Sequence, residues 1–350
     1  MFWHKGSARF FKLLVASSLL VACGAAGTSP QSSTDTALTA GGDGGSSNAG
    51  ASTGRKLQVV ATTSIIGDLA KNVGSERVDV RVLLPPGTDP HTYSPTPSDV
   101  QAISEAHVLF ENGLGLEDWL EELVANAGGS RPTVVVSEGL PTLASAEHEE
   151  HGTGSEHTSA AASAETDAHD QEGAGNDPHM WLDVQNTIGY VENIRDGLKQ
   201  VDAGNVATYD NQAAAYITQL KELDATITQQ VATIPADRRK LVTNHDNFAY
   251  FAKRYGFTVV GNVFENVSTE QEPSAQQIAQ LVQLIREQNV PAAFTENTVN
   301  PRLAEQVANE AGIKVVTDLY TDALGEAGSN GDTYIKMMQY NVQQIVAALQ

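Results

Sequence analysis

The sequence is organised around the stretch PPGTDPHTYSPTP at residues 85–97, which directly follows the apolar run Val78 to Leu84. Proline fixes φ and biases the preceding residue toward extended backbone, so this loop is costly to rearrange. It carries one histidine, His91, near its centre. A side chain held so firmly after a strand is well suited to bind a ligand.

Two further histidines have similar surroundings. The Asp-Pro-His triplet of the first loop recurs at residues 177–179, and His245 follows the strand-like run Lys240 to Thr243. Imidazole nitrogens are common ligands of transition metals. His91, His179 and His245 are far apart in sequence and each follows a predicted strand or lies in a loop, so they predict a metal site assembled by the fold.

Composition excludes several other classes of protein. The formal net charge of -22 and the pI of about 4.6 argue against nucleic acid as a partner, because neutralising phosphates needs clustered Lys and Arg. A single cysteine excludes an internal disulfide framework and a Cys-rich zinc or iron–sulfur site. The length of 350 residues allows two domains with separate cores.

The N-terminal region predicts export and anchoring. A basic start is followed by the apolar run Leu13 to Ala22, which is too short to span a bilayer, and then by Cys23. The segment LVACG resembles the lipobox of bacterial lipoproteins, which implies a signal peptide at residues 1–23 and lipidation of Cys23. Residues 24–55 are rich in Ser, Thr, Gly and Ala and predict a disordered tether. We therefore expect an extracytoplasmic protein anchored to the cell membrane by lipid.

A second biased segment, residues 146–175, combines histidines with acidic side chains and contains no Lys or Arg. It lacks apolar periodicity and predicts a mobile loop. Neutral imidazoles and carboxylates favour a weak collector of transition-metal ions, and the alternative is a solvated acidic insertion. The histidines concerned are His148, His151, His157 and His169.

The remaining chain alternates between strands and helices, which predicts an α/β fold with parallel sheets flanked by helices. Strands are expected at residues 57–61, 78–84, 106–110, 133–136, 240–243, 258–263, 292–295 and 314–317. Helices are expected at residues 64–73 with Ser64 as N-cap, from Pro97, at 116–125, from 184 to about 199, and at 247–255, 272–287, 301–311 and 333–349.

One long helix is predicted between two lobes. Apolar residues recur at spacings of three and four from Val206 to Ile234, over about 29 residues or roughly 43 Å. We expect an N-terminal metal-binding lobe at residues 56–203, a rigid linking helix at 204–235 and a C-terminal metal-binding lobe at 236–350. Ligands of open parallel sheets bind at the carboxyl ends of the strands, near the three histidines.

The body from about Leu57 to Gln350 resembles the metal-binding lipoproteins of bacterial zinc and manganese ABC transporters, the ZnuA, TroA and PsaA group. The resemblance rests on the following blocks, which occur in order: GTDPHTY at 87–93, DPHMWL at 177–182, TNHDNFAYF at 243–251, TEQEPS at 269–274, TENTVNP at 295–301 and LYTDALG at 319–325. It implies a solute-binding component that is not an enzyme and that delivers a metal ion to a membrane permease.

The resemblance also implies the full ligand set, which is His91, His179, His245 and Asp322. Asp322 follows from the family pattern alone, since Asp318 lies close by in sequence. Three imidazoles and one carboxylate suit a borderline-soft divalent ion better than Ca²⁺ or Mg²⁺. His245 as third ligand and the histidine-rich segment before His179 favour Zn²⁺ over Mn²⁺ as the transported ion.

Other interpretations concern both function and single residues. A Mn²⁺-specific protein of the same type is one alternative, and a surface adhesin on the same scaffold is another. An extracytoplasmic zinc metallohydrolase would need a coordination position open to water, with Asp322 away from the metal. His107 is interpreted as structural, and Asp183, Asp246 and Glu296 are candidates to orient the imidazoles. We expect a monomer.

Overall fold

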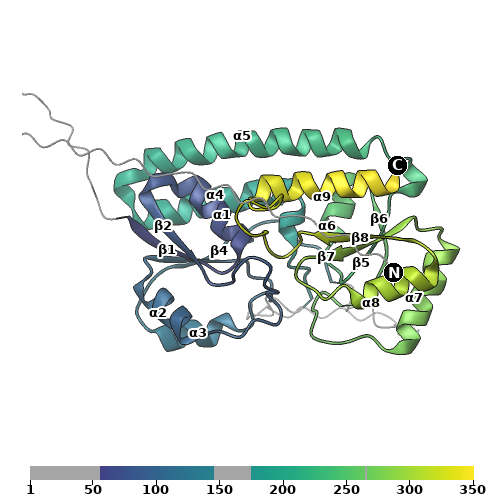
Figure 1. Cartoon of the computed structure of the whole chain (residues 1–350). Coiled ribbons are helices and arrows are strands. Elements are labelled where there is room, and N and C mark those ends of the chain that lie inside the picture. Colours follow the sequence, from purple (N-terminus) through teal and green to yellow (C-terminus); the bar gives the residue numbers. More distant parts are fainter. Residues whose placement is uncertain (1–55, 146–174, 265) are drawn as a thin grey trace, which may run out of the picture. The chain divides into compact units, whose positions relative to one another are not determined.

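The computed structural model describes residues 56–145, 175–264 and 266–350 (Figure 1). Its strands are β1 (Leu57–Ala61), β2 (Val78–Val82), β3 (Val108–Glu111), β4 (Thr133–Val135), β5 (Lys240–Thr243), β6 (Thr258–Asn262), β7 (Ala292–Glu296) and β8 (Lys314–Leu319). Its α-helices are α1 (Ser64–Gly74), α2 (Pro97–Glu105), α3 (Leu120–Ala127), α4 (Val184–Val201), α5 (Val206–Val231), α6 (Ala249–Tyr255), α7 (Ala275–Glu287), α8 (Arg302–Ala311) and α9 (Tyr334–Leu349).

The predicted α/β fold with two lobes is confirmed. The N-terminal lobe has a parallel sheet in the order β2-β1-β3-β4. In the C-terminal lobe β5 pairs with β6 and β7 pairs with β8, all in parallel, and β5 lies beside β7. The carboxyl ends of these strands lead into the loops that carry His91, His245 and Asp322.

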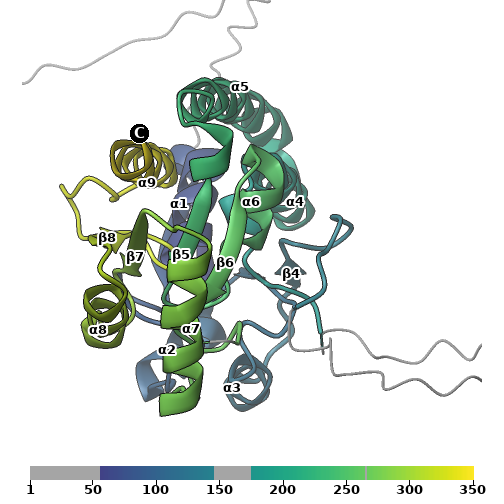
Figure 2. The ribbon, with the colours of Figure 1, turned by 90° about the vertical axis from the view of Figure 1, so that its right-hand side faces the viewer.

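Helices cover both faces of each sheet (Figures 1 and 2). Side chains alternate between the two faces of a strand. On β1, Val59 belongs to the buried cluster formed with α1 and α4, whereas Val60 belongs to the cluster formed with α2 and α3. On β5, Leu241 and Val242 divide in the same way between the α6 and α9 side and the α7 and α8 side. This two-sided burial explains why the strands read as continuous apolar runs.

Several element boundaries differ from those expected; α7, for example, begins at Ala275 and not at residue 272, and α5 ends at Val231 and not at Ile234. Two of the differences have a clear local reason. Helix α1 is capped by Thr63, whose side chain accepts from the N–H of Ile66, and Ser64 is already helical. The helix expected from Leu116 begins only at Leu120. Before it the chain turns through positive φ at residues 113–115 and wraps around the carboxylate of Glu117, which accepts from the backbone N–H groups of residues 112 and 113.

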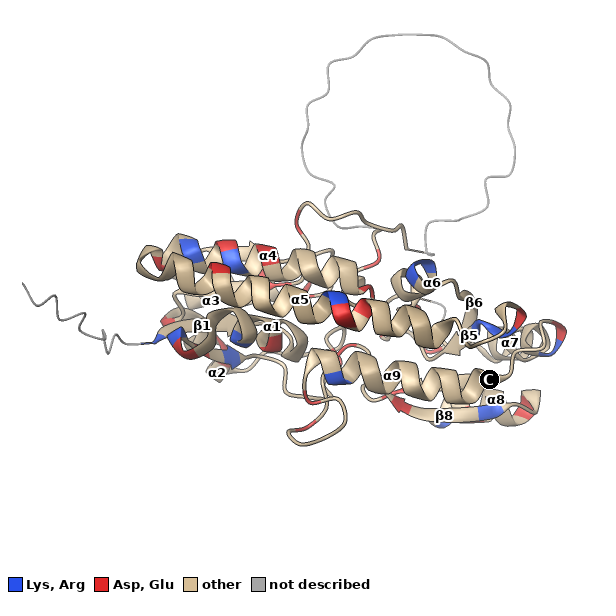
Figure 3. Ribbon diagram, turned by 90° about the horizontal axis from the view of Figure 1, so that it is seen from above, with Lys and Arg blue, Asp and Glu red and all other residues tan. Residues whose placement is uncertain are grey.

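The long helix α5 runs along both lobes (Figures 1 and 3). It packs against α1 and α4 on the N-terminal side and against α6 and α9 on the C-terminal side. Its Asp224 joins these parts, because the carboxylate accepts from Arg254 and from the Tyr255 hydroxyl of α6 and from Gln185 Nε2 of α4. Along the described ranges no helix is long and apolar enough to cross a membrane.

The two lobes share one main hydrophobic core, although the chain length would also have allowed two separate cores. The largest cluster of buried apolar side chains contains Val59 and Phe110 of the N-terminal sheet together with Phe251, Phe294 and Met338 of the C-terminal lobe. Smaller clusters fill the outer face of each lobe. Because one continuous core crosses the boundary, a wide opening of the lobes would expose apolar side chains to water.

This shared core predicts a single cooperative unfolding transition. Denaturation followed by far-UV circular dichroism, which reports both lobes, should coincide with tryptophan fluorescence, which reports Trp119 and Trp181 in the N-terminal lobe. Leu220→Ala removes a fully buried side chain from α5 and should lower the free energy of unfolding by about 2–5 kcal/mol without splitting the transition.

The control is Gln219→Ala, at an exposed position of the same helix, which should change the free energy of unfolding by about 0.5 kcal/mol or less. Two separated transitions in the wild-type protein would contradict the shared core.

Candidate metal centre

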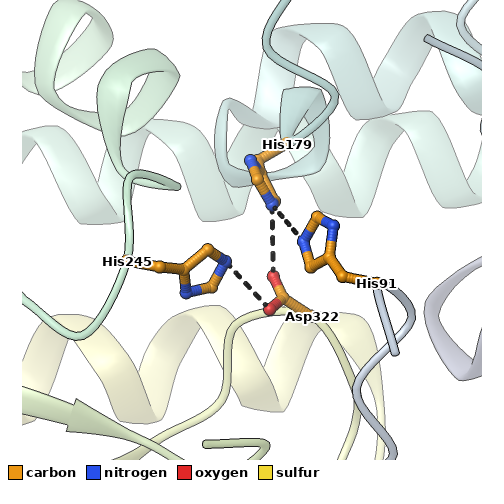
Figure 4. A group of neighbouring side chains, drawn as sticks. All are labelled: His91, His179, His245 and Asp322. Atoms are coloured by element: carbon orange, nitrogen blue, oxygen red, sulfur yellow. Dashed lines mark hydrogen bonds and ion pairs between the residues drawn. The ribbon is translucent and has the colours of Figure 1, made fainter. Parts of the chain in front are cut away.

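Four side chains from separate loops converge at the carboxyl ends of the strands (Figure 4). His91 lies after β2, His179 precedes the short 3-10 turn Met180–Leu182, His245 follows β5 and Asp322 follows β8. One donor atom from each residue lies within 4.8 Å of the donor atoms of the other three. The fold thus brings together the three histidines expected from the sequence and the carboxylate implied by the family resemblance.

The shortest distances between these side chains are those between potential ligand atoms. Nε2 of His91 lies 3.2 Å from Nε2 of His179, and Nε2 of His245 lies 3.3 Å from Oδ2 of Asp322. His179 Nε2 lies 3.8 Å from Oδ1 of Asp322. All three imidazoles therefore present Nε2 toward a common centre (Figure 4).

The two Asp-Pro-His triplets share one hydrogen bond within the triplet but differ in the second contact of the aspartate. Oδ1 of Asp89 accepts from the N–H of His91 at 2.9 Å, and Oδ1 of Asp177 accepts from the N–H of His179 at 2.9 Å. Asp177 also lies 2.7 Å from Nδ1 of its own histidine, which fixes the imidazole. Asp89 instead accepts from the Thr269 hydroxyl in the other lobe. One triplet therefore orients a ring, and the other connects the lobes.

Glu296 supports the third histidine. Its buried carboxylate accepts from the backbone N–H groups of Asn244 and His245 at 3.0 and 3.2 Å. It also accepts from Asn247 Nδ2 and the Thr321 hydroxyl, both at 2.8 Å, and Oε2 lies 2.9 Å from Nδ1 of His245. Glu296 thus holds the loop after β5, the loop after β8 and the imidazole in one arrangement.

The other carboxylates considered as orienting groups have different contacts. Asp183 caps α4 by accepting from the N–H of Gln185 at 2.8 Å, and Asp246 is hydrogen bonded to Asn262. Asp177 was not among the expected orienting residues, although its place in the repeated Asp-Pro-His triplet was a usable signal. Asp318 is exposed on β8, away from the histidines.

His107 has the structural role expected of it. It is exposed, and its Nδ1 accepts from the backbone N–H of Gln58 at 3.0 Å. Cys23 and the histidines of the segment at 146–174 lie outside the described residues, so their predicted roles stay predictions.

The donor set fits a bound cation. His179, His245 and Asp322 are buried, and His91 is partly exposed. Across the residues that the structure describes, His245 Nε2 and both carboxylate oxygens of Asp322 are buried without a hydrogen-bond partner. Unpaired buried polar groups are costly, and the carboxylate is satisfied only if a neighbouring imidazole carries a proton or a cation lies between them. A divalent ion at the common centre would coordinate all of these atoms.

The protonation equilibria follow from this clustering. Burial lowers the pKa of His91 to about 3, and repulsion from His179 and His245 adds to the effect. Burial would lower the pKa of His245, but Glu296 and Asp322 outweigh it and hold the pKa well above its ordinary value. Burial would raise the pKa of Asp322, but the adjacent His245 reverses this and holds the pKa below its ordinary value.

A family model described as "Zinc-uptake complex component A periplasmic" matches residues 59–348. The chain belongs to this family. The manganese-binding lipoprotein MntA of Halalkalibacterium halodurans is 38% identical over 313 residues, which are 89% of this chain and 95% of the relative. The manganese ABC transporter substrate-binding lipoprotein PsaA of Streptococcus mitis is 33% identical over 305 residues, which are 85% of this chain and 91% of the relative.

Solved structures agree with this assignment. The periplasmic zinc-binding protein TroA from Treponema pallidum matches with a TM-score of 0.72 and 32% identity, covering 84% of this chain and 99% of TroA. A Mn-bound periplasmic metal-binding protein from Candidatus Liberibacter asiaticus matches with a TM-score of 0.71 at 24% identity, covering 85% of this chain and 100% of that protein, and supports the fold. The chain is thus the extracytoplasmic substrate-binding component of a metal ABC transporter and not an enzyme, and an ABC permease is its partner.

The paired charges predict how the metal-free protein titrates. At pH 7 we expect His245 to be an imidazolium and His91 to be neutral, which histidine ring NMR over a pH series measures directly. Because the pKa of His245 is raised in the folded state, its protonated imidazole stabilises the fold fully below a pH of about 6.5. This stabilisation is lost as the pH rises through the pKa of His245 in the folded protein. The depressed pKa of Asp322 contributes above pH of about 3.9 and loses its effect as pH falls.

The ion pair of His245 and Asp322 should therefore contribute most to the stability of the metal-free protein between pH values of about 4 and 6.5. Glu296→Gln removes one of the two charges beside His245 and should lower the pKa of that imidazole. A neutral His245 at pH 7 in the wild-type protein would contradict the assignment.

Proposed function

We propose that His91, His179, His245 and Asp322 capture one Zn²⁺ ion between the two lobes for delivery to the permease. The observation that carries this proposal is the convergence of three imidazole nitrogens and one carboxylate, among which His245 Nε2 and both Asp322 oxygens are buried without a hydrogen-bond partner. Four such ligands make a closed sphere for zinc and leave no position for a catalytic water. Mn²⁺ favours sites richer in carboxylate and water oxygens.

Manganese is the alternative cargo. The relatives MntA and PsaA are named for manganese, whereas the similar structure of TroA is titled as zinc binding. Nitrogen-rich sites bind zinc more tightly than manganese in any case, so relative affinity alone does not identify the transported ion. Our preference for zinc rests on the donor set.

Transport in this proposal consists of coordination, docking on the permease and release, with no covalent chemistry. The core shared by the lobes and the packing of α5 against both of them oppose a large hinge movement. Release would then depend on small tilts of the lobes and on the loops that carry the ligands. The hydrogen bond between Asp89 and Thr269 is one of the contacts that such a tilt would break.

The finer features of localisation belong to the same proposal. Cys23 would carry the lipid anchor, with residues 1–23 as signal peptide and 24–55 as tether, and relatives are named as lipoproteins. The histidines at 148, 151, 157 and 169 would collect metal weakly ahead of the central site. We propose that the protein acts as a monomer.

Calorimetry with Zn²⁺ tests the ligand set. The wild-type protein should show one tight site, and His91→Ala should weaken it by about 100-fold or more, because loss of a ligand costs at least as much as loss of an orienting partner. His107→Ala is the matched control and should leave the affinity unchanged, since His107 lies outside the centre. Wild-type affinity in His91→Ala would remove this residue from the site.

Elemental analysis of cells tests the cargo. Cells lacking this protein should contain less zinc and an unchanged amount of manganese when zinc is scarce. Expression of the Asp318→Asn variant should restore the zinc content, because this aspartate is exposed on β8, and expression of Asp322→Asn should not. A loss of manganese instead of zinc would establish the alternative cargo.

A further inference from the structure

A cleft of about 980 Å³ opens beside the centre. It is lined by the loop after His91, by the turn and first residues of α3 at 111–121, and by residues 175–178 and 267–270. Among the four ligands only His91 borders this cleft, and it is also the only one that is not fully buried. The cleft is therefore the side from which the centre is accessible.

The described lining of this cleft is acidic. Glu111, Asp118, Glu121 and Glu270 line it, and none of these carboxylates forms a salt bridge with another described residue. No Lys or Arg is among the lining residues. These unneutralised charges thus act together on whatever occupies the cleft.

A fifth carboxylate in the lining, Glu117, has a different role. It is buried and accepts from the Thr62 hydroxyl at 2.6 Å and from the N–H groups of Asn112 and Gly113 at 2.8 and 3.1 Å. It shapes the turn before α3 and is satisfied there. The four unpaired carboxylates have no comparable structural task.

We propose that this cleft is the path by which the hydrated metal ion reaches the centre, and that Glu111, Asp118, Glu121 and Glu270 steer it toward His91. The inference rests on the proposed metal-binding function and concerns the rate and route of capture. A cation is the expected occupant because His245 Nε2 and the Asp322 oxygens, which lie behind His91, are buried without a hydrogen-bond partner.

The size of the cleft and the charge of its walls suit this task. A water occupies about 30 Å³, so a cation with six waters needs roughly 200 Å³ and fits before it loses its hydration shell. A cleft lined by charges of one sign focuses the field and raises association rates by about 10- to 1000-fold, with a strong dependence on ionic strength. His91 is the first ligand on this path and would take the ion before the three buried ligands do.

The test measures the kinetics of Zn²⁺ binding by stopped flow at several salt concentrations. Tryptophan fluorescence is the signal, since the Trp181 ring lies 5.3 Å from the His179 ring and Trp119 lines the cleft. The cleft variant combines Glu111→Gln, Asp118→Asn, Glu121→Gln and Glu270→Gln. Its association rate should fall by about 10-fold at low salt and lose most of its salt dependence.

A matched control removes the same number of charges away from the cleft. It combines Glu222→Gln, Asp237→Asn, Glu287→Gln and Glu326→Gln, all at exposed positions. This control should keep most of the wild-type association rate and its salt dependence. Both variants should still bind one Zn²⁺ and release it at the wild-type rate, because the four ligands are intact.

The outcomes separate the route from the function. If the cleft variant and the control lose association rate equally, the overall negative charge steers the ion and the proposed path is overturned. If both keep the wild-type rate and salt dependence, the path is overturned as well. Absence of a tight Zn²⁺ site in the wild-type protein would instead overturn the proposed function.

Discussion

The central constraint in this molecule is the burial of one carboxylate against three imidazoles. Asp322 is inaccessible to solvent, and its oxygens face the imidazoles of His245 and His179. In the metal-free protein the charge of Asp322 is balanced by protonation of His245, whose pKa Glu296 and Asp322 together raise. In the proposed function a divalent cation would replace that proton and satisfy all four groups, so a proton and a metal ion would compete for the same site.

The surrounding structure holds this costly arrangement in place. Asp177 and Glu296 each lie at the Nδ1 side of an imidazole and leave Nε2 directed at the common centre. Further hydrogen bonds join the lobes close to the ligands, including Trp181 Nε1 to the carbonyl of Thr321 at 2.7 Å and the N–H of Leu324 to the Ser64 hydroxyl at 2.9 Å. The four candidate ligands are therefore preorganised by partners that belong to both lobes.

The same connections limit how the protein can move. Two-lobed binding proteins with independent cores close around a ligand by a hinge, whereas here the main apolar cluster and α5 belong to both lobes. Local changes in the loop at residues 266–273 are less costly, because this loop is held by polar contacts such as the one between Asp89 and Thr269. Capture and release through one edge of the centre, next to His91, agrees with this restriction.

Local patterns in the sequence determined the fold class, the long helix and part of the candidate metal centre. The two-sided apolar strands predicted parallel sheets covered by helices, the stripe at 206–234 predicted the linking helix, and the repeated Asp-Pro-His triplets marked two of the three histidines at the centre. These features depend on spacing and on the stiffness of proline, which operate over a few residues.

Only the tertiary structure decided which distant groups meet. Nothing in the local sequence separates the exposed Asp318 from the buried Asp322, and only the family resemblance implied the second. The continuous core and the acidic cleft beside His91 also emerged only from the folded chain. Burial, charge pairing and shared packing arise here between segments that can lie more than a hundred residues apart. Short-range periodicity in the sequence therefore cannot predict them.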